Sequence, residues 1–147
     1  MPTDTLFSLA NSAALLGWTA LALSPLAPRP AVMLAGRIIP LALATLYTGL
    51  VLAFWSGAEG GFSTLPDVMA LFRTPEITLA GWAHYLAFDL FVGAWVAQTA
   101  RSEGIPHYQT LPLLLLTFLF GPAGFLATQL LRTARSPFPS LQPKGQP

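Results

Sequence analysis

The sequence predicts an all-α integral membrane protein, a four-helix bundle with a short surface helix in its second loop. Charged residues make up 9% of the 147 residues and hydrophobic residues 54%, whereas a soluble domain carries about 25% charged residues. The mean hydropathy is +0.61. Four stretches are apolar and long enough to cross about 30 Å of hydrocarbon, which takes roughly 20 helical residues. We therefore expect lipid, and not water, to surround most of the chain.

The four predicted spans form one domain over residues 1–131 and lie at residues 6–23, 31–55, 75–98 and 108–131. The second span contains a single charge, Arg37. The third opens with Thr74 as N-cap and Pro75 at the first helical position. Pro112 and Pro122 predict kinks in the fourth span. The carbonyl groups freed by such kinks need donors from a neighbouring helix, because lipid supplies none.

The second loop, residues 56–74, is the only long connection. Ser63 or Thr64 can cap a short helix there, and we expect this helix to lie on the membrane surface. Residues 132–147 are polar and rich in proline, so we expect a disordered tail. Four crossings place both termini on one side, and the basic residues of that side predict that it faces the cytoplasm. The heavy use of Ala, Leu, Pro and Arg favours a bacterial inner membrane.

The charge balance and the lack of cysteine exclude several classes of function. The formal net charge is +1, which argues against a nucleic-acid partner. Because the chain contains no cysteine, disulfides, thiolate catalysis and thiolate metal sites are excluded. His84 and His107 are the only histidines, and no metal-binding or phosphate-binding motif occurs. We therefore expect neither a metal ion nor another cofactor.

Two ionisable residues, His84 and Asp89, lie near the middle of the third span. An Asp at this depth costs about 2.5–3.5 kcal/mol on insertion scales, so it is expected to face the bundle interior and to have a partner. Trp82, Tyr85 and Asp89 share one helix face, whereas His84 lies on another. Structural roles stay open: Asp89 can pair with Arg37, and His84 can bind a carbonyl freed by a proline. Intramembrane charges are nevertheless candidate functional residues.

The residues around His84 and Asp89 can likewise be structural or functional. Trp82, Tyr85 and Phe88 are either packing residues or the walls of a ligand site. Asn11, at mid-depth in the first span, is either an interhelical hydrogen-bonding residue or part of that site.

One run in the third span is long and specific: Gly81-Trp82-Ala83-His84-Tyr85-Leu86-Ala87-Phe88-Asp89-Leu90. Together with Gly104-Ile105-Pro106-His107 and Gly121-Pro122-Ala123-Gly124, it resembles the abscisic-acid-deficient-four-like family over residues 6–131. Plant members of that family are plastid membrane proteins required for converting violaxanthin to neoxanthin. The resemblance implies a hydrophobic isoprenoid or carotenoid ligand.

Three functional hypotheses follow. The first is a membrane enzyme that isomerises a carotenoid epoxide, with Asp89 as the acid, His84 as the base, and a substrate site lined by Trp82, Tyr85, Phe88, Arg37 and Asn11. The second is a non-catalytic carotenoid-binding or lipid-binding subunit that assists a partner membrane enzyme. The third is a small transporter or assembly factor. The expected partners are membrane lipid, a polyene ligand, and either a second copy of the chain or a partner enzyme.

Overall fold

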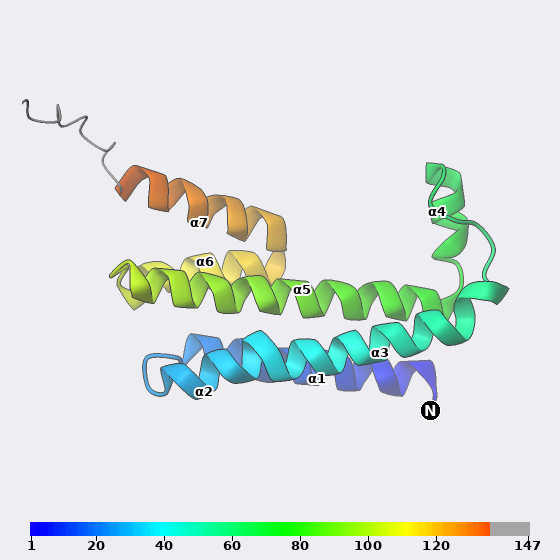
Figure 1. Ribbon diagram of the computed structural model, residues 1–147, viewed down its shortest axis with the longest axis horizontal. Helices are drawn as coiled ribbons and strands as arrows, with labels where there is room; N and C mark the ends of the chain where they lie inside the picture. Colours follow the sequence, from blue (N-terminus) through cyan, green and yellow to red (C-terminus); the bar gives the residue numbers. More distant parts are fainter. Residues whose placement is uncertain (136–147) are drawn as a thin grey trace, which may run out of the picture.

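The computed structural model describes residues 1–135, which contain helices and no strand, as the sequence predicts (Figure 1). The elements are α1 Thr3–Ala22, α2 Pro28–Met33, η1 Leu34–Ile38, α3 Ile39–Phe54, η2 Trp55–Gly57, α4 Leu65–Leu71, α5 Pro75–Ser102, α6 His107–Leu119 and α7 Gly121–Arg135.

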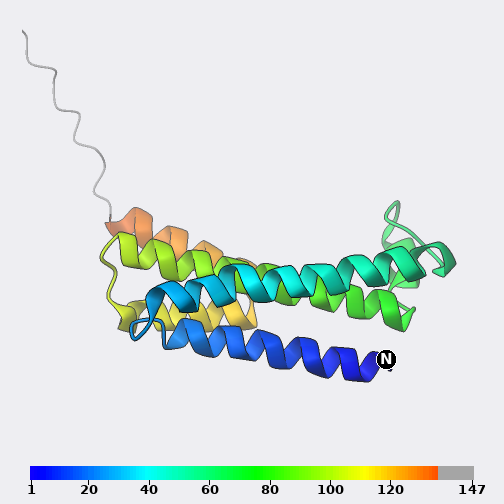
Figure 2. The ribbon, with the colours of Figure 1, turned by 60° about the horizontal axis from the view of Figure 1, so that its bottom comes forward.

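Three continuous helical segments are long and apolar enough to cross a membrane, namely Thr3–Ala22, Pro28–Gly57 and Pro75–Ser102. They coincide with the first three predicted spans and run antiparallel in chain order (Figure 2). Buried residues make up 56% of the most apolar part of α5, against 28% and 17% in the other two. Helix α5 is therefore the central helix, and α1, α3, α6 and α7 all pack against it.

The fourth predicted span is not a single helix. Helix α6 continues through Pro112 and ends at Leu119, and α7 then runs back alongside it over one half of α5 (Figures 1 and 2). The two helices have 13 and 15 residues. At a rise of 1.5 Å per residue each is about 20 Å long, which is less than the roughly 30 Å of hydrocarbon. The described chain thus contains three long helices and a half-length hairpin, so a four-helix bundle is not confirmed.

Pro122 explains why the helix stops. Proline has no backbone N–H, and in a continuous helix its ring would clash with the carbonyl group of Phe118, four residues earlier. The sequence predicted a kink here, but the chain reverses instead. The reversal is tight because Gly124 lies against Thr117, where a Cβ atom on Gly124 would overlap the Thr117 hydroxyl and backbone nitrogen.

The hairpin changes the expected topology. Because it returns to the end of the bundle from which it came, Thr3 and Arg135 lie at opposite ends of the long helices (Figure 1). The prediction of both termini on one side assumed a fourth crossing, and it stays a prediction. The predicted disordered tail began at residue 132, but α7 continues to Arg135. The rest of that tail, residues 136–147, lies outside the described residues.

The short helix predicted in the second loop is confirmed as α4. The Thr64 side chain caps it by accepting a hydrogen bond from the Asp67 backbone N–H at 3.3 Å. The axis of α4 runs across the long helices (Figure 1), as expected for a helix on a membrane surface. Phe72, just after α4, packs against Gly81 of α5, where an added Cβ would come within 2.6 Å of the ring.

The second long helix contains one turn of π-helix, Leu34–Ile38. Pro40 gives the physical reason, since it cannot donate to the Gly36 carbonyl group and its ring crowds that group. Gly36 also lies close to α5, because a Cβ atom there would be 3.0 Å from the Ala94 Cβ. The irregular turn carries Arg37, the only charge of the second predicted span.

Candidate functional site

Asp89 is the one charged residue that the described part of the chain buries, with 9% of its surface exposed. Its carboxyl group lies against Gly121 at the start of α7 and beside the Tyr85 hydroxyl group. The Asp89 Oδ2 atom is buried and has no hydrogen-bond partner among the described residues. One oxygen atom of this buried carboxyl group is therefore left without a polar partner, which is costly in an apolar interior.

The position of Asp89 also stabilises the hairpin. The first N–H groups of a helix have no partner within the helix, and the helix dipole makes this end positive. The Asp89 carboxyl group lies at this end of α7, where a Cβ atom on Gly121 would overlap its Oδ1 atom. Asp89 thus connects α5 to the apex of the hairpin, which is a structural role as well as a candidate functional one.

Tyr85 binds the other side of the same apex. Its hydroxyl group donates to the carbonyl oxygens of Phe118 and Leu119, at 3.5 and 3.4 Å. These carbonyl groups end α6, and the chain reversal before Pro122 deprives them of donors within the helix. From the sequence, His84 was one candidate for binding such a carbonyl group. In the structure Tyr85 does so.

Trp82 and Asn11 are joined across α5 and α1, since Trp82 Nε1 donates to Asn11 Oδ1 at 3.1 Å. This confirms Asn11 as an interhelical hydrogen-bonding residue. The Trp82 ring also packs against Tyr85 and Phe7, with centroid separations of 5.2 and 5.8 Å. Because Trp82 is 38% exposed, this aromatic cluster opens to the outside of the bundle. It adjoins Asp89 through Tyr85.

His84 lies apart from this cluster. Its side chain is exposed and packs against Tyr47 and Phe88, with centroid separations of 5.8 and 4.6 Å. No hydrogen bond of His84 occurs within residues 1–135. His84 and Asp89 therefore form no ion pair or hydrogen bond within residues 1–135, and Phe88 packs beside His84 and not beside Trp82.

Arg37 does not pair with Asp89, so that structural alternative was wrong. It lines a separate cavity together with Arg29 and Arg101. The one salt bridge in the described part of the chain joins Arg132 to Glu103. Within the same residues, no three His, Asp or Glu side chains are placed to hold a metal ion.

Sequence reasoning missed two members of the site, Gly121 and Phe7. The closely spaced Gly121, Pro122 and Gly124 were a signal for a chain reversal, but the apolar residues on both sides favoured a single kinked span. Phe7 lies at the beginning of α1 and had no distinguishing signal in the sequence.

Comparison with known proteins gives one family. The family described as ABA DEFICIENT 4-like matches residues 5–127. No curated protein and no solved structure matches the chain. The matched range includes Asp89, Tyr85, Trp82, Asn11 and the apex of the hairpin.

Proposed function

The chain belongs to the ABA DEFICIENT 4-like family, and on this basis we propose that it binds or acts on a carotenoid or related isoprenoid within the membrane. The family is consistent with a carotenoid-related role. The match also confirms the resemblance carried by residues 81–90. A polyene is long and apolar, so it partitions into the same hydrocarbon layer that surrounds the three long helices.

The observation that carries the proposal is the buried, unpaired carboxyl oxygen of Asp89, which adjoins an open aromatic cluster through Tyr85. Ligand sites combine apolar and aromatic walls with a few polar groups that fix the orientation of the ligand. Here the exposed rings of Trp82 and Phe7 provide the apolar surface, and Asp89 Oδ2 provides the polar group. An oxygen-bearing end group of a carotenoid fits this combination.

We propose isomerisation of a carotenoid epoxide as the reaction. The protonated Asp89 carboxyl group donates its proton to the epoxide oxygen, and the carbon–oxygen bond nearest the polyene breaks. This leaves a hydroxyl group and a cation conjugated with the polyene. Loss of a proton from the adjacent polyene carbon gives an allene, and the Asp89 carboxylate accepts that proton. The product has the same atoms as the substrate, and Asp89 returns to its starting form.

This scheme assigns both proton transfers to Asp89, because His84 lies on another face of α5. The aromatic ring of Trp82 supports the step, since a π face stabilises nearby positive charge. The alternative is a carotenoid-binding subunit that performs no reaction. It is favoured by the contact of Asp89 with Gly121, which gives the carboxyl group a structural reason to be present.

The test is expression in cells that accumulate epoxidised carotenoids, followed by chromatography of the pigments. Asp89→Asn keeps the size of the side chain, but its amide group is not acidic and cannot protonate the epoxide oxygen. His84→Ala is the matched control, because the scheme does not use His84. Both variants are compared with the original chain for expression, monodispersity and helix content.

A new isomer formed by the original chain and by His84→Ala, but not by folded Asp89→Asn, supports the enzyme. Pigment that co-purifies unchanged with the original chain supports the binding subunit instead. Loss of product in folded His84→Ala contradicts the assignment of both transfers to Asp89. If pigment neither changes nor binds, the carotenoid proposal is rejected.

A further inference from the structure

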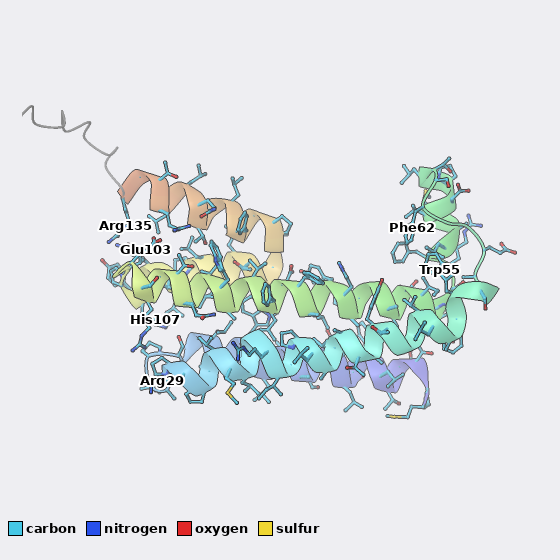
Figure 3. The ribbon with its side chains drawn as sticks, viewed as in Figure 1. Arg29, Trp55, Phe62, Glu103, His107 and Arg135 are labelled. Carbon is cyan, nitrogen blue, oxygen red and sulfur yellow. The ribbon has the colours of Figure 1, made fainter. Side chains whose placement is uncertain are left out.

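A second site lies in a cavity of about 940 Å³ between α2, η1 and α5. Its lining includes neither Asp89 nor any member of the aromatic cluster. Three arginines reach it from three separate elements: Arg29 from α2, Arg37 from η1 and Arg101 from the last turn of α5. Arg29 and His107, which also lines the cavity, lie at the same end of the molecule (Figure 3).

These three guanidinium groups have no carboxylate partner within residues 1–135. The acidic residue that closes α5, Glu103, pairs with Arg132 instead. Three cations that line one cavity repel each other, and an anion between them removes that cost. Guanidinium groups present planar pairs of donors that match phosphate oxygens, so a phosphate group is the anion that this arrangement fits best.

Apart from Ser24, whose hydroxyl group is uncharged, the other polar side chains of the cavity are already engaged. His107 Nε2 donates to the Ala22 carbonyl oxygen at 2.8 Å, and Gln98 Nε2 donates to that of Ala94 at 3.3 Å. The Thr110 hydroxyl group donates to the Pro106 carbonyl oxygen at 3.3 Å. The arginines are therefore the groups available for a ligand.

The remaining lining is apolar and continues onto the outer face of the bundle. Val32 and Met33 from α2, and Phe91 from α5, belong to it. Met33 and Phe91 are more than half exposed, and on a membrane-spanning helix such side chains face hydrocarbon. Two of the arginines, Arg29 and Arg101, thus lie near helix ends, whereas Arg37 lies deeper, beyond Met33 along the same continuous helix. The apolar part of the lining is continuous with the lipid.

We propose that this cavity binds the phosphate group of an anionic amphiphile. The phosphate lies between Arg29, Arg37 and Arg101, and the hydrocarbon tail follows Phe91 and Met33. Basic pockets between helices at a membrane surface bind anionic lipid headgroups in this way. The site is independent of the proposed polyene site, because the two share no residue.

The experiment measures the melting temperature of the full chain, purified in a neutral detergent, against increasing ligand. The probes are short-chain phosphatidylglycerol, short-chain phosphatidylcholine of zero net charge, and inorganic phosphate. The variants are Arg29→Gln, Arg37→Gln and Arg101→Gln. Arg73→Gln is the matched control, since Arg73 is exposed next to α4 at the other end of the bundle.

We expect phosphatidylglycerol to raise the melting temperature of the original chain and of Arg73→Gln. We expect Arg29→Gln, Arg37→Gln and Arg101→Gln each to raise the apparent Kd for phosphatidylglycerol about tenfold, because each removes a charge-assisted hydrogen bond. If inorganic phosphate acts as strongly, the site binds a free phosphate and the tail adds nothing. Equal stabilisation by phosphatidylcholine, the same Kd in every variant, or no stabilisation by either anion overturns the proposal. All three arginines are exposed, so we expect each variant to fold, and Arg29 at the start of α2 is the least involved in helix packing.

Discussion

The Asp89 carboxyl group lies directly against Gly121, at the point where α7 begins. A Cβ atom at residue 121 would overlap the Asp89 Oδ1 atom. This contact links the buried charge of α5 to the chain reversal between α6 and α7. The half-length hairpin and the candidate functional group are therefore parts of one structural unit, and a change in either is expected to affect the other.

Gly121→Ala tests this unit. We expect the added methyl group to separate α7 from Asp89 and to destabilise the protein by about 1–3 kcal/mol, as overpacking of a close contact does. Gly49→Ala in α3 is the control, because a Cβ atom at Gly49 meets nothing within 4 Å and alanine favours a helix. Denaturant titration in detergent measures both. Equal stability of the two variants would contradict the close contact.

Tyr85→Phe removes the donor from the carbonyl oxygens of Phe118 and Leu119. We expect the free energy of unfolding to fall by about 0.5–1.5 kcal/mol, because these carbonyl groups end α6 and no nearby water replaces the hydroxyl group. Tyr47→Phe is the control, since the Tyr47 ring packs against His84 and its hydroxyl group makes no hydrogen bond in the described residues. The same titration compares them, and a larger loss in Tyr47→Phe would refute the assignment.

The hydrogen bond between Trp82 and Asn11 can be measured with a double-mutant cycle. Trp82→Phe, Asn11→Ala and the double variant together isolate the coupling between the two side chains. We expect a coupling free energy of about 0.5–1 kcal/mol, as for other hydrogen bonds between membrane helices. Strictly additive losses would mean that the 3.1 Å contact contributes nothing to the packing of α1 against α5.

Local sequence was sufficient for the elements whose determinants are local. Length and hydropathy located the three long helices, and Thr64 predicted the start of α4. Helix geometry also separated His84 from Asp89 correctly. The hairpin could not be predicted in this way, because Pro122 is compatible with either a kink or a reversal. Reversal leaves carbonyl groups without helical donors, so it depends on Tyr85 being placed to bind them and on Asp89 lying against Gly121 at the start of α7.

The same dependence explains why the sequence could not say what surrounds His84. Helix geometry gives the angle between two side chains, but it does not say which face of α5 the hairpin covers. The hairpin covers the face of Asp89 and leaves His84 exposed beside Tyr47. The arginine cavity was also beyond sequence reasoning, since Arg29, Arg37 and Arg101 come from three elements whose packing no local pattern specifies.

The ion pair between Glu103 and Arg132 predicts a pH dependence. Hydrogen bonding to Arg132 holds the pKa of the Glu103 carboxyl group below its usual range. A carboxyl group with a lowered pKa in the folded state stabilises the protein above its unfolded pKa, and this contribution disappears as the pH falls through the folded pKa. Melting curves of Glu103→Gln should therefore lie slightly below those of the original chain at pH 7 and coincide with them in acid. Glu59→Gln, which removes no ion pair, is the control and should show no such convergence.

The final prediction concerns orientation in the membrane, and it follows from the hairpin. One end of the bundle carries a single acidic residue, Glu103, beside Arg29, Arg101, Arg132 and Arg135. The other end carries a single basic residue, Arg73, beside Asp4, Glu59, Asp67 and Glu76. Because basic residues favour the cytoplasmic side, we expect the end with Arg101 to be cytoplasmic and Thr3 and α4 to lie on the opposite side.

The chain contains no cysteine, so single cysteines can report this orientation without background. Ser63→Cys lies in the loop before α4, and Ser102→Cys lies at the end of α5; both positions are exposed. A membrane-impermeant maleimide applied to intact spheroplasts should label Ser63→Cys at once and Ser102→Cys only after the membrane is permeabilised. The reverse pattern would place Arg101 and the cavity with Arg29 and Arg37 outside the cytoplasm. Labelling of both positions in sealed cells would mean that α5 does not cross the membrane, because these two residues lie on either side of it.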